Sequence, residues 1–198
     1  MKIFHVETGC HLYGGALQVQ YLMQGLARLG HRNVLLCDRR SPLAQAAQGV
    51  AKVYARHTRG DLDLPLVGRL WRLLRRERPD LLHLHSRRGA DLLGGIAGRL
   101  AGLPVLLTRR VDNREPRALV PPKYALFDHV VAISQGIAAV LRADGVPAAK
   151  ISCVPSAVDS EVYRPRRDRA WLAAETGIAP QQPVIGMVAQ LIPRKGHR

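Results

Sequence analysis

The chain has 198 residues, 47% hydrophobic and 5% aromatic, and its 30 Lys and Arg exceed its 15 Asp and Glu to give a formal net charge of +15. This length and apolar content predict a folded domain with one sizeable core plus part of another, and they exclude a disordered chain. The three cysteines lack a CxxC spacing, which argues against a disulfide framework and a zinc site and indicates a reducing cytoplasm. The sequence contains no apolar run of about 18 residues, so we expect no membrane span. The excess of arginine indicates anionic partners or substrates.

Strand and helix patterns alternate along most of the chain. Short apolar or β-rich segments predict strands at 2–6, 33–37, 51–55, 81–85, 104–108, 129–133 and 151–155. Apolar residues at helical spacing predict helices over 14–29, 64–79, 89–102 and 134–145. Ser134 is the expected N-cap of the last helix, while Gly30 and Gly145 follow two helices as C-terminal caps. The alternation predicts an α/β fold, a doubly wound Rossmann-like parallel sheet with helices on both faces.

The first helix begins on the pair Gly14-Gly15, although glycine costs roughly 1 kcal/mol against alanine in a helix. One explanation is a tight strand-to-helix turn. The other is that a ligand approaches the free N–H groups and the positive dipole end of the helix, which often holds phosphate.

The last part of the chain differs in composition. Residues 1–165 form the predicted Rossmann-like domain, 166–183 have the charged and then Pro- and Gln-rich composition of a connector, and 184–198 begin an incomplete second domain. We expect "VIGMVAQL" (184–191) to be a strand without its native partners. We also expect the second domain to continue past Arg198.

Ligands of open α/β sheets bind beyond the carboxyl ends of the strands. Polar residues follow the first, fourth and fifth predicted strands there: Thr8, His11, Gly14 and Gly15; His85, Ser86, Arg87 and Arg88; Thr108, Arg109, Arg110 and Asp112. Arginines at such positions can hold phosphate through paired hydrogen bonds. Neither GxGxxG after the first strand nor GxxxxGK[ST] is present, so the sequence does not support a dinucleotide site or a P-loop.

Several segments occur in a familiar order: Gly14-Gly15 before a helix that ends in "LARLGHRNVLL", then "RPDLLHLHS", "DHVVAISQGIAAVLRADGVPAAKISCVPSAVDSEVYRP" and "IGMVAQLIPRKGH". Together they resemble the amino-terminal portion of the group-1 retaining glycosyltransferases, which have the two-domain GT-B fold. The resemblance implies sugar transfer from a nucleotide-sugar donor to an acceptor, in a cleft between two domains and without a required metal or other cofactor. The first domain would hold the acceptor.

The resemblance also implies roles for single residues. Gly14 and Gly15 match the glycine loop that gives the donor phosphates room, and His85 matches a histidine that contacts donor sugar or acceptor. Lys195 takes the place of a lysine on the donor diphosphate. Gln190 stands where the family usually has an arginine, a loss for which Arg194 is the expected compensation. Ser156 and Ala157 depart from the family's pattern in the crossover loop, as Ala189 does in the second domain.

Basic loops and the acceptor domain together favour an anionic or lipid-linked acceptor of cell-envelope polysaccharide or lipopolysaccharide synthesis. The expected acceptor-binding residues are His11, Arg87, Arg88, Arg109 and Arg110, and the expected catalytic residue is His85. The arginines of the helix over 64–79 are typical of a solvated helix face, although the stripe of Arg69, Arg72 and Arg76 would also suit an anionic membrane surface. We therefore expect a cytoplasmic protein that is peripheral on the inner membrane, with residues 1–198 alone inactive in transfer.

Alternative functions and roles stay open at this point. The chain could be a non-catalytic α/β binding module, or a basic nucleic-acid-binding domain, although the absence of a recognition motif argues against nucleic acid. His83 and His85 lie two apart on one strand and therefore share a face. A metal pair is one interpretation, but no third ligand follows at a useful spacing, so a hydrogen-bonded core residue is the better account of His83.

Overall fold

The structure, a computed structural model, describes residues 1–60, 63–85, 89–165, 169–179, 181–189, 191 and 196. The chain divides into two compact units, Met1–Ala157 and Val158–Arg198. The first unit contains the whole sheet and is the one that positions the candidate site.

The first unit is built on a seven-stranded sheet in which every pair of neighbours is parallel. Its strands are β1 (Lys2–Glu7), β2 (Arg32–Asp38), β3 (Ala51–Arg56), β4 (Leu81–Leu84), β5 (Val105–Arg109), β6 (His129–Ala132) and β7 (Ile151–Cys153). The strand order is β3-β2-β1-β4-β5-β6-β7, so the sheet is wound outward in both directions from β1 and β4. The predicted doubly wound Rossmann-like sheet is confirmed, with strand ends within two residues of those expected.

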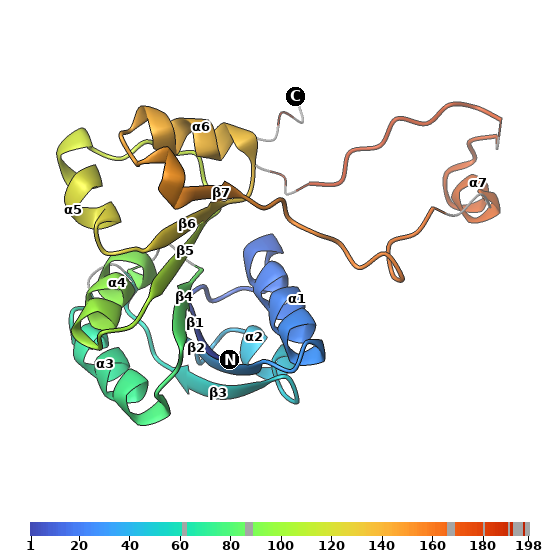
Figure 1. The fold of residues 1–198 in the computed structure, drawn as a ribbon. Helices are drawn as coiled ribbons and strands as arrows, with labels where there is room; N and C mark the ends of the chain where they lie inside the picture. The colour runs from blue at the N-terminus through green and yellow to red at the C-terminus, as the bar shows by residue number, and fades with distance from the viewer. Residues whose placement is uncertain are drawn as a thin grey trace. The chain divides into compact units, whose positions relative to one another are not determined.

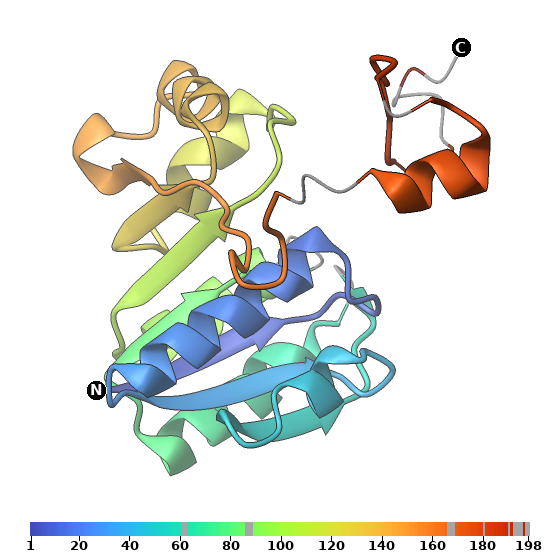
Figure 2. The same cartoon turned by 90° about the vertical axis from the view of Figure 1, so that its right-hand side faces the viewer.

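Helices cover both faces of this sheet (Figures 1 and 2). They are α1 (Gly14–Arg28), α2 (Leu43–Ala46), α3 (Pro65–Glu77), α4 (Ala90–Leu100), α5 (Val120–Tyr124) and α6 (Gln135–Ala143). Single 3-10 turns lie at Arg117–Leu119 and Ala148–Lys150. Figure 1 places α1 and α2 on one side of the strands and α3 and α4 on the other.

Each face has its own hydrophobic cluster. Phe4 and Val6 of β1 belong to the larger cluster, together with residues of α3, α4, α5 and α6. Leu35 and Cys37 of β2 belong to the smaller cluster, with residues of α1 and α2. Successive side chains of a strand face opposite sides of the sheet. His5 comes between Phe4 and Val6 in the sequence, so its side chain lies on the opposite face of β1, the α1 side.

The predicted helix caps are confirmed. The Oγ of Ser134 accepts a hydrogen bond from the backbone N–H of Ile137 at 3.2 Å, which satisfies a free donor at the start of α6. Gly30 has φ +80° and Gly145 has φ +97°, the left-handed conformation that follows many helices and suits glycine.

Helix α3 has the amphipathic pattern expected of it. Leu70 and Leu74 are buried in the larger cluster, while Arg72 and Arg76 are exposed. Arg69 donates to Asp63 Oδ2 at 2.6 Å and is partly held by it. No helix in the described part of the chain is long and apolar enough to cross a membrane.

The second unit contains α7 (Ala170–Thr176), which ends at Gly177 with φ +70°. The strand expected at 184–191 is not present in residues 184–189, which form no helix or strand. A strand needs a neighbour to pair its backbone N–H and C=O groups. The apolar pattern of these residues was therefore not sufficient to form one.

Close packing of α4 on the sheet leads to a first prediction. A Cβ at Gly98 would lie 2.6 Å from Val105 Cγ2 and 2.7 Å from Leu82 Cδ2, whereas a Cβ at Gly68 of the neighbouring α3 would meet nothing within 4 Å. We expect Gly98→Ala to lower the free energy of unfolding by about 1–3 kcal/mol through overpacking. Gly68→Ala should raise it by up to about 1 kcal/mol through helix propensity. Urea unfolding followed by circular dichroism measures both; equal effects would contradict the packing account.

Candidate active site

A cleft of about 370 Å³ lies at the carboxyl ends of β1, β4 and β5. Its lining includes five of the residues expected to bind ligand: His11, Gly15, His85, Arg109 and Arg110. Glu7, Tyr13, Asp91 and Thr108 also line it. Three segments far apart in the sequence therefore meet at one site, as expected for the carboxyl edge of a parallel sheet.

The amino terminus of α1 forms one wall of the cleft. Its N-cap is Tyr13, which makes no side-chain cap, and its first turn contains no acidic residue. Tyr13, Gly15 and Ala16 line the cleft, so the uncapped N–H groups and the positive end of the helix dipole lie beside it. This arrangement favours an anionic ligand group.

The two glycines that begin α1 differ in their surroundings. A Cβ at Gly15 would lie 3.4 Å from Arg110 Cδ, while a Cβ at Gly14 would meet nothing within 4 Å. The backbone of neither residue has a positive φ. Turn geometry therefore does not require this glycine pair, and ligand approach remains the explanation we prefer for it.

Arg109 and Arg110 are neighbours in sequence, but their guanidinium groups make different hydrogen bonds within the protein. The guanidinium of Arg109 donates to Val111 O at 3.0 Å, Asn113 O at 2.6 Å and Glu115 Oε1 at 2.7 Å. Arg109 thus holds the loop after β5 in place, and its predicted role in acceptor binding stays a prediction.

Arg110, in contrast, keeps donor capacity for a ligand. Its Nε is buried and has no hydrogen-bond partner among the described residues. Burial lowers the pKa of the guanidinium, although the charge of Glu7 acts in the opposite direction. Arg110 Nε is therefore a buried donor that no described residue uses.

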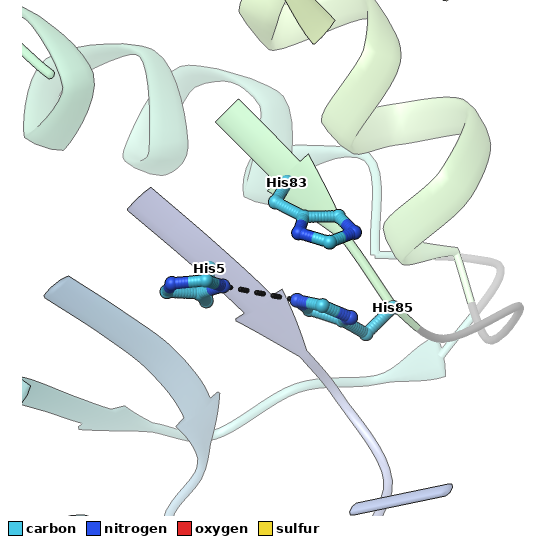
Figure 3. Close-up of side chains that lie close together, drawn as sticks. All are labelled: His5, His83 and His85. Carbon is cyan, nitrogen blue, oxygen red and sulfur yellow. Dashed lines mark hydrogen bonds between the residues drawn. The ribbon is translucent and has the colours of Figure 1, made fainter. Parts of the chain in front are cut away.

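Three buried histidines lie on the α1 side of the sheet beside the cleft (Figure 3). His5 of β1 stands opposite His83 of β4 in the register, and His85 directly follows β4. His5 Nδ1 and His85 Nε2 are 3.0 Å apart, and the rings of His83 and His85 are tilted with centroids 3.8 Å apart. The backbone N–H of His85 donates to the backbone oxygen of Val6 at 3.0 Å, which continues the hydrogen bonds between the strands and fixes the backbone of His85.

Burial keeps the three imidazoles neutral at physiological pH. It lowers the pKa of His5 to about 4. Burial is also the largest cause that holds the pKa of His83 and His85 well below the usual range, with further lowering by the neighbouring histidines and Arg110. The site therefore offers neutral hydrogen-bonding groups, with positive charge supplied by Arg110 and the α1 amino terminus.

His83 is hydrogen-bonded within the core. Its Nε2 lies 2.7 Å from Thr108 Oγ1, and 6% of the residue is exposed. The interpretation of His83 as a satisfied core histidine agrees with this contact.

The same cluster raises the question of a metal. One nitrogen from each of His5, His83 and His85 lies within 4.8 Å of the others, an arrangement that could hold an ion. The third ligand that the sequence did not supply at a useful spacing thus comes from another strand. The expectation that the protein needs no metal stays a prediction.

Two hydrogen bonds between Gln18 and Ala157 join the end of the first unit to α1. Gln18 Nε2 donates to Ala157 O at 2.6 Å, and Ala157 N–H donates to Gln18 Oε1 at 2.9 Å. This is the segment where Ser156 and Ala157 depart from the family pattern. The altered loop is thus attached to the helix whose amino terminus forms the cleft.

The other predicted site residues lie outside the described residues: Arg87, Arg88, Arg194 and Lys195. Gly14 is described but does not line the cleft. Sequence reasoning missed His5 and Asn33, which contact each other at 3.1 Å beside His85. The available signal was a polar residue within an otherwise apolar strand in "KIFHV" and "NVLLC", since buried polar groups need partners.

Comparison with known proteins identifies a family that matches most of the first unit. The family described as Glycosyltransferase Family 4 matches residues 13–162. Comparison with the curated proteins gives no significant match.

Solved structures with the same fold include two proteins of named organisms. HepE from Anabaena in complex with UDP has a TM-score of 0.72 at 16% identity, over 89% of this chain and 50% of that chain. A glycosyltransferase from Rickettsia africae has a TM-score of 0.73 at 15% identity, over 92% of this chain and 51% of that chain.

The lipopolysaccharide outer core galactosyltransferase WaaB is a third similar structure. It has a TM-score of 0.60 at 17% identity, over 80% of this chain and 46% of that chain. The chain thus spans about half the length of these structures, which agrees with the expected half of a GT-B architecture.

The buried histidines predict a loss of stability in mild acid. The unfolded chain binds protons at a histidine below its ordinary pKa of 6.5, whereas His5 in the folded chain does so only near pH 4. The stability that depends on neutral His5 is therefore present in full above pH 6.5, and it is lost as the pH falls from there toward 4. We expect roughly 1.4 kcal/mol per pH unit for each such histidine. Urea unfolding between about pH 7 and 5 measures the slope, which His83→Gln should reduce by about a third; a flat profile would contradict neutral burial.

Proposed function

This chain belongs to Glycosyltransferase Family 4, and on that premise we propose that it is the acceptor-binding half of a retaining, group-1 glycosyltransferase. The complete enzyme transfers a sugar from a nucleotide-sugar donor to an acceptor in a cleft between two Rossmann-like domains. Residues 184–198 begin the donor-binding domain in this proposal. No metal or other cofactor takes part.

The observation that carries the proposal is the content of the cleft. It combines the uncapped start of α1, the free Nε of Arg110 and the neutral imidazole of His85 at the carboxyl edge of the sheet. Cationic and N–H donors suit phosphate or another anionic group. A neutral imidazole suits a sugar hydroxyl and adds no charge beside a sugar ring that becomes positive during transfer.

The donor in this proposal is a nucleotide sugar. HepE has been solved with UDP and with UDP-glucose, which supports a nucleotide-sugar partner for a chain of the same fold. Lys195 and Arg194 are the proposed contacts to the donor diphosphate, and Gly14 and Gly15 leave room for it. His85 positions the reacting groups and stabilises the transition state, and we assign no protein nucleophile.

The acceptor is anionic or lipid-linked and belongs to cell-envelope polysaccharide or lipopolysaccharide synthesis. The net charge of +15 and the exposed arginines of α3 support an anionic partner, and a lipopolysaccharide galactosyltransferase has the same fold. We place the enzyme in the cytoplasm, peripheral on the inner membrane. Orientation of donor against acceptor needs both domains, so residues 1–198 alone should transfer sugar negligibly.

A chain in which residues 1–198 continue into the rest of a donor-binding domain tests the reaction. It should release nucleoside diphosphate from a nucleotide sugar when an acceptor is present. Nuclear magnetic resonance of the product should give the same anomeric configuration as the donor. An inverted product would exclude the retaining mechanism, and no release with any of a panel of donors and acceptors would exclude the transferase.

The role of Arg110 can be tested on the chain as it stands, with glucose 1-phosphate as the probe. Arg110→Gln should weaken binding about tenfold because it removes the charge and the free donor of the cleft. Arg72→Gln, an exposed change of the same charge on α3, should alter the affinity less than about twofold. Calorimetry at two salt concentrations measures both, and affinity should fall with added salt because charges are screened over about 8 Å at physiological ionic strength. A larger effect of Arg72→Gln would move anion binding to α3.

The role of His85 is tested by His85→Ala in the two-domain enzyme. We expect kcat to fall by about 10- to 1000-fold through loss of a positioned polar contact. Stability should also fall, by about 1–3 kcal/mol, because His5 loses its partner in a buried site. Kinetics are therefore measured well below the melting temperature, with His129→Ala on β6 as the control. Normal turnover in a less stable His85→Ala would make His85 a core residue only.

A further inference from the structure

Asn33 has a fixed orientation in the core beneath the cleft. Its Nδ2 lies 2.9 Å from Met23 O and 3.1 Å from Val50 O, so both hydrogens of the amide are used on carbonyl groups. Its Oδ1 lies 3.1 Å from His5 Nε2. A carbonyl oxygen can only accept, so the network assigns the proton of His5 to Nε2.

The position of this proton determines the state of the next ring. Burial lowers the pKa of His5 to about 4 and that of His85 well below the usual range, so each ring carries a single proton at neutral pH. With its proton on Nε2, His5 presents an unprotonated Nδ1 to His85 Nε2 at 3.0 Å. His85 must donate in this contact, and its own proton is therefore on Nε2.

The remaining nitrogen of His85 is then a lone-pair acceptor. His85 is 2% exposed, its Nδ1 is buried, and no partner for that atom exists among the described residues. Figure 3 shows this nitrogen on the side of the ring turned away from His5. His85 is a lining residue of the cleft, and a ligand donor there would offset the cost of its unsatisfied buried acceptor.

We propose that Asn33 and His5 are positioning residues that hold His85 in the Nε2–H tautomer, so that His85 Nδ1 accepts a hydrogen bond from a ligand hydroxyl in the cleft. An unprotonated phosphate oxygen cannot donate and is excluded from this position. It is directed instead to Arg110 and the amino terminus of α1. The identification of the hydroxyl as one of a sugar rests on the proposed function, whereas the tautomer does not.

A metal ion on His5, His83 and His85 is the competing account of this cluster. It would need one nitrogen from each ring, and the nearest pair, His5 Nδ1 and His85 Nε2, is 3.0 Å apart. That separation is typical of a hydrogen bond with one proton between two neutral rings. The Asn33 amide determines that His85 donates and His5 accepts in this bond. The geometry therefore favours the hydrogen-bonded chain.

Nuclear magnetic resonance of the 198-residue chain with nitrogen-15-labelled histidine tests the tautomers directly. We expect His5 and His85 both to carry the proton on Nε2 and to have an unprotonated Nδ1. Saturating sulfate, which carries no O–H group at neutral pH, should leave His85 Nδ1 unprotonated and its resonance unshifted. A proton on His85 Nδ1, a shift of that resonance by added sulfate, or displacement of the His5–His85 proton by added Zn²⁺ would each overturn the proposal.

Variants then separate positioning from structural support. His5→Phe and Asn33→Leu remove the acceptor or its orientation while they keep most of the side-chain volume. Leu35 lies in β2 opposite His5 in the register and is fully buried. Leu35→Ala is the control, because it lowers the stability of the protein but leaves the chain of polar side chains intact. We expect the first two to give a mixture of His85 tautomers and, in the two-domain enzyme, to lower kcat about tenfold with little change in KM.

Leu35→Ala should lower the melting temperature but keep the tautomer, with kcat within about twofold of the parent. A single Nε2–H tautomer that persists in His5→Phe would overturn the proposal. An enzyme without transferase activity would refute the proposed function but would leave the tautomer result standing. The two failures are thus distinguishable.

Discussion

The parallel pairing of β1 with β4 is the constraint on which the candidate site depends. It sets His5 opposite His83 in the register and brings His85 to the end of β1. The carboxyl ends of β1, β4 and β5 then lie at one edge of the sheet, so the start of α1, His85 and Arg110 border the same cleft. A different order of parallel strands would keep these residues at the same edge but would separate them along it.

Two buried polar networks hold this cleft from different sides. On the α1 side, Asn33, His5 and His85 form a chain of neutral hydrogen bonds within the sheet. Beyond β5, ion pairs join Arg109 to Glu115, Glu115 to Lys123, and Lys123 to Asp91. Buried polar groups are costly when unpaired and rigid when fully paired. Among the described residues, His85 Nδ1 and Arg110 Nε are buried atoms without a partner that belong to residues lining the cleft, and Glu115 Oε2 in the second network also has none.

Local sequence patterns predicted most of the fold. Helical periodicity, Ser134 as an N-cap and Gly30 and Gly145 as C-terminal residues depend on neighbours within a few positions, and each is confirmed. The strand expected at 184–191 is absent from residues 184–189 because a strand also depends on a distant partner. The same limit applies to the arginine pair. The sequence placed both arginines at the expected ligand edge, whereas tertiary contacts engage Arg109 and leave Arg110 Nε without a partner among the described residues.

The sequence by itself determined the class of fold and the edge of the sheet where polar side chains collect, since both follow from periodicity and from the direction of parallel strands. Only the tertiary structure decided which of these side chains touch. His5 and His85 are 80 positions apart, and His5 and Asn33 are 28 apart. Their contacts depend on strand order and register, which local patterns do not specify. The protonation of His85 is in turn fixed by an amide that no motif identifies.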